Sequence, residues 1–400
     1  MSIQLSKNTT ITAKAIEEDE REDKRRKRLL LLLMLLLALL ACVVTLFIRY
    51  LWQPVPLPEL LPIPVNVNYA PHYLFSIYEI ERPIGVAVSP DGDRIYVAET
   101  GGERLVKVFD RDGDLLNSFA PPRTRPGERS PVYVTTDKTG RVYVTDRLQH
   151  AVFVYDELGT YLDTILGPDL TLSEYVSKHV GSLPPGTVLA YNSFEPDAYY
   201  QIGETEQTIP APSPVGWAPL GIRMDSAGNM LLTDVAADRH AVREISSDVL
   251  LSASWQDFAP PENIFGAYGQ GDGQLLFPNT AVAGSRGRVY VTDGNNGRIS
   301  VWDGEGNFLF HFGQGSGDGA LSLPRGAVID SRDRLHVVDA VGQDIKVYDV
   351  SGSEINLLFA FGDWGMGDGQ FNYPSDIALD ATGRVYVADR ENNRIQIWSY

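Results

Sequence analysis

The feature that most constrains the fold is a unit of short strand-like runs that recurs six times from residue 83 onward. In the last copy, the runs 377–379, 384–388 and 394–398 have strand character, with β-branched and aromatic residues alternating as in Val385-Tyr386-Val387. The turn 380–383 and the polar corner 389–393 separate these runs. Alternation of this kind between turn-forming segments is typical of consecutive antiparallel strands.

Each copy begins at a proline, and its second run is followed by an acidic residue. The prolines are Pro83, Pro131, Pro219, Pro278, Pro324 and Pro374, and the acids are Glu99, Asp146, Asp234, Asp293, Asp339 and Asp389. Five residues after the acid, four copies carry an arginine: Arg104, Arg239, Arg298 and Arg394. A carboxylate after a strand accepts backbone N–H bonds and pairs with an arginine at the same corner. We therefore interpret these residues as structural corners of the repeat.

Four strands in a unit of about 46–50 residues are typical of the blades of a β-propeller. The sixth copy ends after three strands, which would leave an open sheet edge. We expect the strand-like run 73–80 to pair with 394–398 and to close the ring. The predicted fold is thus all-β, a six-bladed propeller closed by an N-terminal strand.

Residues 72–400 resemble the NHL-repeat family of β-propellers. The resemblance is strongest in 384–398, in 288–302 and in the glycine-rich segment 365–371. It implies a six-bladed propeller of the NHL type. The second, third and fifth copies depart from the family pattern at the arginine or its neighbours, which leaves those corners less constrained.

The N-terminal region predicts one membrane-spanning helix. Residues 1–28 form a charged tail that ends in the basic run 24–28, and residues 29–48 carry no charge. A segment of this length spans a hydrocarbon core of about 30 Å. The basic run predicts a cytoplasmic tail, a transmembrane signal anchor over 29–49 and an extracytoplasmic remainder in a cell membrane. A lipoprotein attached through Cys42 and a cleaved signal peptide are the alternatives.

The segment 50–71 is rich in proline and is predicted to be an extended linker. Residues 51–400 carry 25 Lys/Arg and 46 Asp/Glu, because nine of the 34 basic and six of the 52 acidic residues lie within 1–50. The resulting net charge of −21 argues against nucleic-acid binding and favours cationic partners. The single cysteine excludes an intrachain disulfide.

Positions just after each proline are expected to ring the mouth of the propeller channel. The polar or bulky side chains there, or slightly deeper, are the candidate ligand-binding residues Tyr133, Arg223, Asn279, Arg325 and Asp376. The calcium-dependent six-bladed hydrolases use a Glu, Asn, Asn and Asp ring, of which only Asn279 and Asp376 are available. Related lyases hold zinc with histidines, and none lies on an expected first strand. We therefore assign no catalytic residue, no metal ligand and no cofactor.

An insertion, residues 168–218, separates the second and third copies. It is predicted to contain a short helix over 171–180, followed by an aromatic and acidic stretch. Exposed aromatic side chains suit contacts with a partner, and the candidates are Tyr191, Phe194, Tyr199, Tyr200 and Trp217. A cap packed on the propeller is the alternative.

These patterns predict a membrane-anchored, extracytoplasmic propeller, residues 72–400, that binds a protein or glycan partner through the channel mouth and the insertion. The alternative is a metal-dependent hydrolase or lyase at the mouth.

Overall fold

A computed structural model describes residues 25–45, 48, 69–212, 216–237, 239–251 and 263–400. The chain divides into two units, Met1–Ile63 and Pro64–Tyr400. The described part of the first unit contains the helix Arg25–Thr45, which has 21 residues and a mean hydropathy of 2.7. At 1.5 Å per residue it is long and apolar enough to cross a membrane. It begins four residues before the predicted start, within the basic run. Residues 1–24 of the predicted tail and residues 50–68 of the predicted linker lie outside the described residues.

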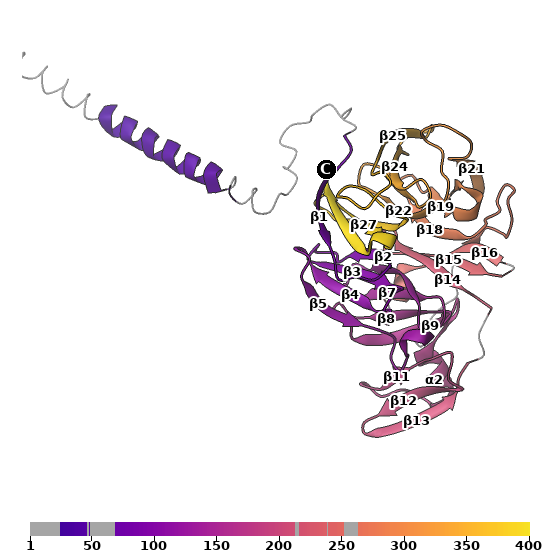
Figure 1. Ribbon diagram of the computed structural model, residues 1–400. Coiled ribbons are helices and arrows are strands. Elements are labelled where there is room, and N and C mark those ends of the chain that lie inside the picture. Colours follow the sequence, from indigo (N-terminus) through magenta and orange to yellow (C-terminus); the bar gives the residue numbers. More distant parts are fainter. Residues whose placement is uncertain (1–24, 46–47, 49–68, 213–215, 238, 252–262) are drawn as a thin grey trace, which may run out of the picture. The chain divides into compact units, whose positions relative to one another are not determined.

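The described part of the second unit consists mainly of antiparallel sheets, each built from consecutive strands (Figure 1). Four of them have four consecutive strands: β2 (Pro83–Val88), β3 (Arg94–Glu99), β4 (Val106–Asp110) and β5 (Leu115–Phe119); β14 (Pro219–Met224), β15 (Met230–Ala236), β16 (Arg239–Ile245) and β17 (Asn263–Phe265); β18 (Pro278–Ala283), β19 (Val289–Asp293), β20 (Arg298–Trp302) and β21 (Phe308–Phe312); β22 (Pro324–Ile329), β23 (Arg334–Asp339), β24 (Asp344–Asp349) and β25 (Asn356–Phe361).

Three further sheets differ from this pattern. One has five strands: β6 (Pro131–Thr136), β7 (Val142–Asp146), β8 (Ala151–Tyr155), β9 (Tyr161–Gly167) and β10 (Leu170–Thr171). Another joins β26 (Pro374–Leu379), β27 (Arg384–Asp389) and β28 (Arg394–Ser399) to the distant β1 (His72–Ile77). The third has three strands: β11 (Val188–Ala190), β12 (Asp197–Ile202) and β13 (Thr205–Pro210). The described residues thus form seven sheets, where the repeats predict six.

Burial is highest in the second strands and lowest in most of the fourth strands. Every residue of β27 is buried, whereas β5 exposes four of its five residues. The second strands are apolar on both faces because each sheet is covered on both sides by its neighbours. The fourth strands β5, β21 and β25 lie at a sheet edge and are largely exposed or half-buried, although β21 and β25 are rich in aromatic and aliphatic residues.

The first strands of six sheets lie next to one another. β2 contacts β6, and the contacts continue through β14, β18, β22 and β26 back to β2. The predicted pairing of the N-terminal run with the last strand is present: Tyr73 lies opposite Trp398 and Ile77 opposite Ile395. The N-terminal strand ends at Ile77, three residues before the predicted limit.

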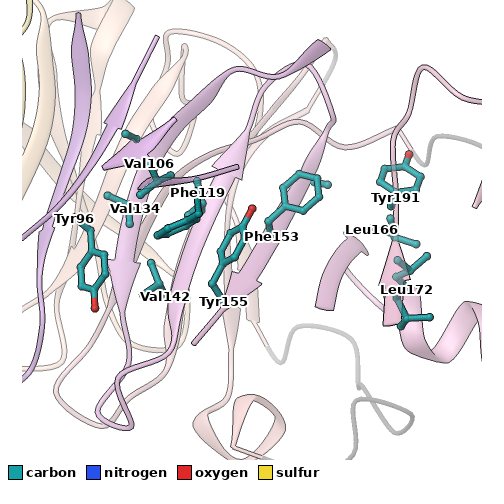
Figure 2. Packing of buried hydrophobic residues seen from close by; sticks show 14 of the residues in the cluster. Tyr96, Val106, Phe119, Val134, Val142, Phe153, Tyr155, Leu166, Leu172 and Tyr191 are labelled. Atoms are coloured by element: carbon teal, nitrogen blue, oxygen red, sulfur yellow. The ribbon is translucent and has the colours of Figure 1, made fainter. Parts of the chain in front are cut away.

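Aromatic side chains fill the space between neighbouring sheets. Phe119 of β5 packs on Tyr155 of β8 with ring centroids 4.4 Å apart, and Figure 2 shows these rings beside Val106, Val134 and Val142. Trp398 of β28 is covered by Tyr73, Phe361 and Phe371 in the same way. Burying one such ring stabilises a fold by about 1.5–3 kcal/mol, so these contacts hold adjacent sheets together.

The insertion is an ordered element on the edge of the second sheet (Figure 1). The helix α2 (Leu172–Val180) agrees with the predicted helix; Thr171 Oγ1 accepts from Glu174 N at 3.3 Å and caps its start. Leu172 and Val176 are fully buried, and α2 contacts β9. The short helices α3 (Ser247–Leu250), η1 (Pro126–Glu128), η3 (Gly294–Asn296) and η4 (Arg390–Asn392) complete the described elements outside Arg25–Thr45.

Candidate functional site

The six first strands share a local irregularity directly after their prolines. In each of β2, β6, β14, β18, β22 and β26 the register with the second strand shifts after the proline. Such a bulge re-aims the side chains that follow. These residues, with the loops between sheets and between second and third strands, form what we call the mouth face.

Hydroxyl groups tie the bulged residues of one sheet to the next sheet. Thr145 Oγ1 donates to Leu220 O at 2.6 Å, and Thr280 Oγ1 donates to Arg325 O at 2.9 Å. Ser375 Oγ contacts the carbonyl oxygen of Pro83 at 3.0 Å, which joins β26 to β2. Each hydroxyl group belongs to one sheet and each carbonyl group to the next. These bonds therefore fix the backbone of the bulged residues against the neighbouring sheet.

Glycines in alternate sheets make room for this close approach. A Cβ on Gly85 would lie 2.8 Å from Tyr133 Cα, one on Gly221 would lie 1.7 Å from Asn279 O, and one on Gly326 would lie 2.2 Å from Asp376 Oδ1. Real Cβ atoms do not approach other atoms so closely. Three candidate site residues therefore pack directly against glycine.

Arg223 and Asp376 form a buried ion pair between β14 and β26. Asp376 is fully buried and also accepts from Val86 N at 3.0 Å. The Arg223 guanidinium also donates to Ala327 O and Ile377 O at 3.3 and 3.2 Å. Burial raises the pKa of Asp376, and the charge of Arg223 opposes that rise. One ion pair thus connects β2, β14, β22 and β26.

Tyr133 and Arg325 lie close to this pair. The Arg223 Cζ is 5.9 Å from the centre of the Tyr133 ring. Burial, followed by the charge of Asp376, raises the pKa of Tyr133 well above its ordinary value, whereas Arg325 and Arg223 lower it. Among the candidate ligand-binding residues, three buried polar atoms have no hydrogen-bond partner in the described structure: Tyr133 Oη, Asn279 Oδ1 and Arg325 Nε. The structure thus brings Tyr133, Arg223, Arg325 and Asp376 together, and Asn279 lies beside β22 through a 3.3 Å bond to Pro324 O.

The predicted corner pairing is present in two sheets. Arg298 Nε donates to Asp293 Oδ2 at 2.8 Å, and Arg394 Nε donates to Asp389 Oδ2 at the same distance. Arg394 Nη2 also donates to Gly367 O and Gln370 O at 2.7 and 2.8 Å, so it fixes the glycine-rich segment before β26. All four paired side chains are almost fully buried.

The pairing predicted for Arg104 and Arg239 is wrong, because other cations take the corner. Asp234 pairs with Arg243 at 3.0 Å, while Arg239 donates to Gly216 O. Glu99 pairs with Lys107 at 3.0 Å, while Arg104 donates to Arg129 O at 3.1 Å. Lys346 pairs with Asp339 at 3.2 Å. Each of these cations lies on the third strand opposite the residue two before the acid: Lys107 opposite Val97, Arg243 opposite Leu232 and Lys346 opposite Val337. Residues two apart on a strand share one face, so a cation at this register position can reach the acid.

The corner of the second sheet uses backbone groups. Asp146 accepts from Ser130 N at 2.8 Å, from Leu148 N at 2.9 Å and from Gln149 N at 3.0 Å. Burial raises its pKa to about 6 in spite of these bonds. All six predicted acids are therefore buried at a strand end, but their partners differ.

The expected exposure of the insertion aromatics is wrong for four residues of five. Tyr191, Tyr199, Tyr200 and Trp217 are all less than 10% exposed, and only Phe194 is exposed, at 55%. The reason is the unpredicted three-stranded sheet: Tyr191 and Tyr200 join the cluster that includes Phe153, Leu166 and Leu172, some of which Figure 2 shows. Trp217 Nε1 donates to His150 O at 2.7 Å.

The insertion is attached to loops of the mouth face. Gln149, in the β7–β8 loop, donates from Nε2 to Asn192 Oδ1 at 3.0 Å and accepts from Ser193 N at 2.7 Å. Asn192 Nδ2 donates to Glu128 Oε2 of η1 at 3.1 Å. Phe194 therefore follows directly after two residues that are fixed to this face.

A cavity of about 350 Å³ lies in the insertion, at its junction with the loop after β5. Its lining includes Arg123, Asn192, Glu195, Asp197, Tyr199 and Thr208. The Arg123 guanidinium lies 3.5 Å from the centre of the Tyr199 ring and also contacts Glu206 at 3.3 Å. A second cavity, of about 380 Å³, lies at the other ends of β14, β18 and β22 and reaches Arg223.

Sequence reasoning missed a group of side chains on the mouth face: Arg82, Tyr373 and Arg390. Arg82 and Tyr373 stand immediately before the prolines of β2 and β26, and Arg390 stands immediately after the acid Asp389. Both Arg82 and Tyr373 have left-handed backbone, with φ of 53° and 54°. Inspection of the residues before each proline, in addition to those after it, would have found two of them.

Within the described ranges, no three histidine, cysteine, aspartate or glutamate side chains come together in a way that could hold a metal ion.

Comparison with known proteins identifies one repeat and the general fold. A family model for the NHL repeat matches residues 371–398. The E3 ubiquitin-protein ligase TRIM56 of Mus musculus is 35% identical over 86 residues, and that of Homo sapiens is 34% identical over the same length. These matches cover 21% of this chain and 11% of the length of the relatives.

The fold is similar to that of solved propellers. A streptogramin B lyase structure superposes with a TM-score of 0.50 at 14% sequence identity, covering 82% of this chain and 98% of that one. At this identity the likeness concerns the fold alone. Residues 371–398 therefore form an NHL repeat within a chain of β-propeller fold.

Proposed function

We propose that the protein is a membrane-anchored, extracytoplasmic scaffold whose six-bladed, NHL-type propeller binds a protein or glycan partner. The six sheets that begin at β2, β6, β14, β18, β22 and β26 are the blades, and β1 closes the ring by completing the last blade. The contacts among the first strands and the pairing of β1 with β28 support this arrangement. The seventh sheet belongs to the insertion.

The anchor is the helix Arg25–Thr45, with the basic N-terminal side in the cytoplasm. Its length and apolar composition support a membrane span, and the excess of Lys/Arg on its N-terminal side supports this orientation. A protease added outside intact cells tests the topology: we expect it to remove the propeller and to leave a tag at residue 1 protected.

The observation that carries the binding proposal is the attachment of the insertion to the mouth face. Gln149 and Glu128, both in mouth-face loops, hold Asn192 and Ser193. Phe194 is 55% exposed next to this attachment, and an exposed aromatic ring suits a binding contact. The insertion and the channel mouth thus offer one binding surface.

Deletion of 168–218 would remove the buried Leu172 and Val176, so a surface substitution is the sharper experiment. The full chain is purified from membranes after crosslinking, and co-purified proteins and glycans are quantified for the original chain, Phe194→Ser and Leu158→Ser. Leu158 is a matched control, since it is 57% exposed in the β8–β9 turn, outside the mouth face. We expect Phe194→Ser alone to lose a partner; equal recovery from all three chains would refute the insertion as a binding surface.

The alternative, a metal-dependent hydrolase or lyase, predicts stoichiometric calcium or zinc in the purified protein. Elemental analysis of the same preparation decides between the two functions.

A further inference from the structure

Two arginines on the mouth face, Arg325 and Arg390, lie beside the ring of Tyr373, and a third, Arg82, shares the carboxylate of Glu391 with Arg390. Arg325 is the second residue of β22, Arg390 begins η4, and Arg82 directly precedes β2. The Cζ atoms of Arg325 and Arg390 lie 5.3 and 5.5 Å from the centre of the Tyr373 ring. Arg325 Nη2 also donates to Tyr373 Oη at 3.0 Å. Residues from three sheets thus place their guanidinium groups in one small area.

Among the ion pairs of the described structure, a single carboxylate, that of Glu391, pairs with members of this arginine group. Glu391 Oε1 lies 2.8 Å from Arg82 Nη2 and 3.5 Å from Arg390 Nε. Burial is the main reason that the pKa of Arg390 is lowered, and the positive charges of Arg82 and Arg325 contribute to the shift. The three guanidinium groups therefore lie close together with one carboxylate between them. This cluster of positive charge stands out because residues 51–400 carry a net charge of −21.

Several N–H donors of these guanidinium groups have no acceptor within the described residues. A guanidinium has five N–H donors, and within the described residues the Arg325 side chain donates only to Tyr373 Oη. The Nε atoms of Arg325 and Arg390 are buried and have no hydrogen-bond partner in that part of the chain. Arg325 and Arg390 are nevertheless only partly buried as residues, so their outer nitrogens are reachable from solvent. Unused charged donors of this kind are satisfied when an oxyanion binds.

We propose that Arg82, Arg325 and Arg390 form a binding site for a compact oxyanion, a carboxylate or phosphate group carried by the ligand of the mouth face. This inference rests on the proposed function, because it names the chemistry that the mouth face recognises. The planar guanidinium fork matches both groups. The net charge of −21 over residues 51–400 repels long polyanions, so the site selects an isolated anionic group rather than a nucleic acid or a polyacidic chain.

Calorimetric titration of the full chain in detergent, at pH 7 and low ionic strength, tests this site. Inorganic phosphate and citrate are titrated separately, which distinguishes a phosphate from a carboxylate ligand. We expect at least one of them to bind, and Arg390→Gln and Arg325→Gln each to weaken that binding by about tenfold. Arg286→Gln, in the exposed turn between β18 and β19, removes the same charge outside the mouth face and should leave binding unchanged.

A variant that is expected to strengthen anion binding, rather than weaken it, excludes an indirect structural effect. Glu391→Gln removes the carboxylate that pairs with Arg82 and Arg390, so it should tighten anion binding several-fold, whereas structural damage would weaken it. Thermal unfolding of each variant confirms that it is folded. Absence of phosphate and citrate binding, an unchanged affinity in Arg390→Gln, or weaker binding in Glu391→Gln would each overturn the inference. Partner recovery that still depends on Phe194 would then show that the oxyanion site alone had failed.

Discussion

Arg223 and Arg390 are both arginines of the second unit, but their surroundings differ in every respect that matters for their role. Arg223 is almost completely buried, pairs with Asp376 and donates to three backbone carbonyl groups. Arg390 lies at the mouth face among two other arginines, and its nearest carboxylate oxygen is 3.5 Å away. A fully partnered arginine holds strands together, whereas an incompletely partnered one is available to a ligand. The following substitutions test this distinction.

The largest loss of stability is expected for Asp376→Ala. It leaves the Arg223 charge buried without its partner, which costs about 3–5 kcal/mol in the free energy of unfolding. Urea unfolding of the full chain, followed by tryptophan fluorescence, measures this loss. The double variant Arg223→Met with Asp376→Leu removes both charges and should be less destabilised than Asp376→Ala. If the double variant has a lower free energy of unfolding than Asp376→Ala, the unpaired charge of Arg223 is not the cause of the destabilisation.

A smaller loss is expected at the corner of the third sheet. Arg243→Ala removes the two bonds to the buried Asp234, each donated at 3.0 Å, and should cost about 2–3 kcal/mol. Arg239→Ala is the matched control, because Arg239 is exposed and stands at the position where the sequence placed the partner; its loss should stay below about 1 kcal/mol. Equal losses in the same urea experiment would contradict the observed pairing.

The next largest loss of stability is expected from a side chain added where two first strands pack closely. Gly326→Ala places a Cβ 2.2 Å from Asp376 Oδ1, so the ion pair must shift, at a cost of about 1–3 kcal/mol. Gly127→Ala, where nothing lies within 4 Å, serves as the control. A Gly326→Ala protein as stable as the control would show that Asp376 is not packed against this strand.

The smallest effect on stability is expected at the mouth. Arg390→Gln should change the free energy of unfolding by no more than about 0.5 kcal/mol, because the side chain makes few bonds within the fold. Differential scanning calorimetry of the full chain provides the measurement. A loss above about 2 kcal/mol would place Arg390 with Arg223 as a structural residue.

Much of the fold could be predicted because the repeat is local. The apolar second strands, such as 385–387 in β27, and the pairing of β1 with β28 follow from alternation and from the missing fourth strand. The three-stranded sheet of the insertion was missed because 188–210 lacks the repeat. Its tyrosines were expected to be exposed, since a sequence shows that a ring is present but not which surface covers it.

The site was predicted only in part, because it is assembled by contacts between sheets. Arg223, Asp376, Tyr133 and Arg325 do lie together, but the pairing of Arg223 with Asp376 joins residues 153 positions apart. Fixed spacing correctly paired Arg298 and Arg394 with their acids and failed for Arg239, because Arg243 reaches Asp234 from the same strand face. The arginines around Tyr373 have no local pattern in common.

The pairing of β1 with β28 has a consequence for how the protein is made. Where these strands meet, Arg82 N donates to the side chain of Asn393, which is 311 residues away. During translation β1 is therefore synthesised long before β28. Until β28 has been synthesised, the edge of β1 that will pair with it stays unpaired. Pairing of β1 with β28 is for this reason a late event, and until then the unpaired edge of β1 is open to pairing with a neighbouring molecule.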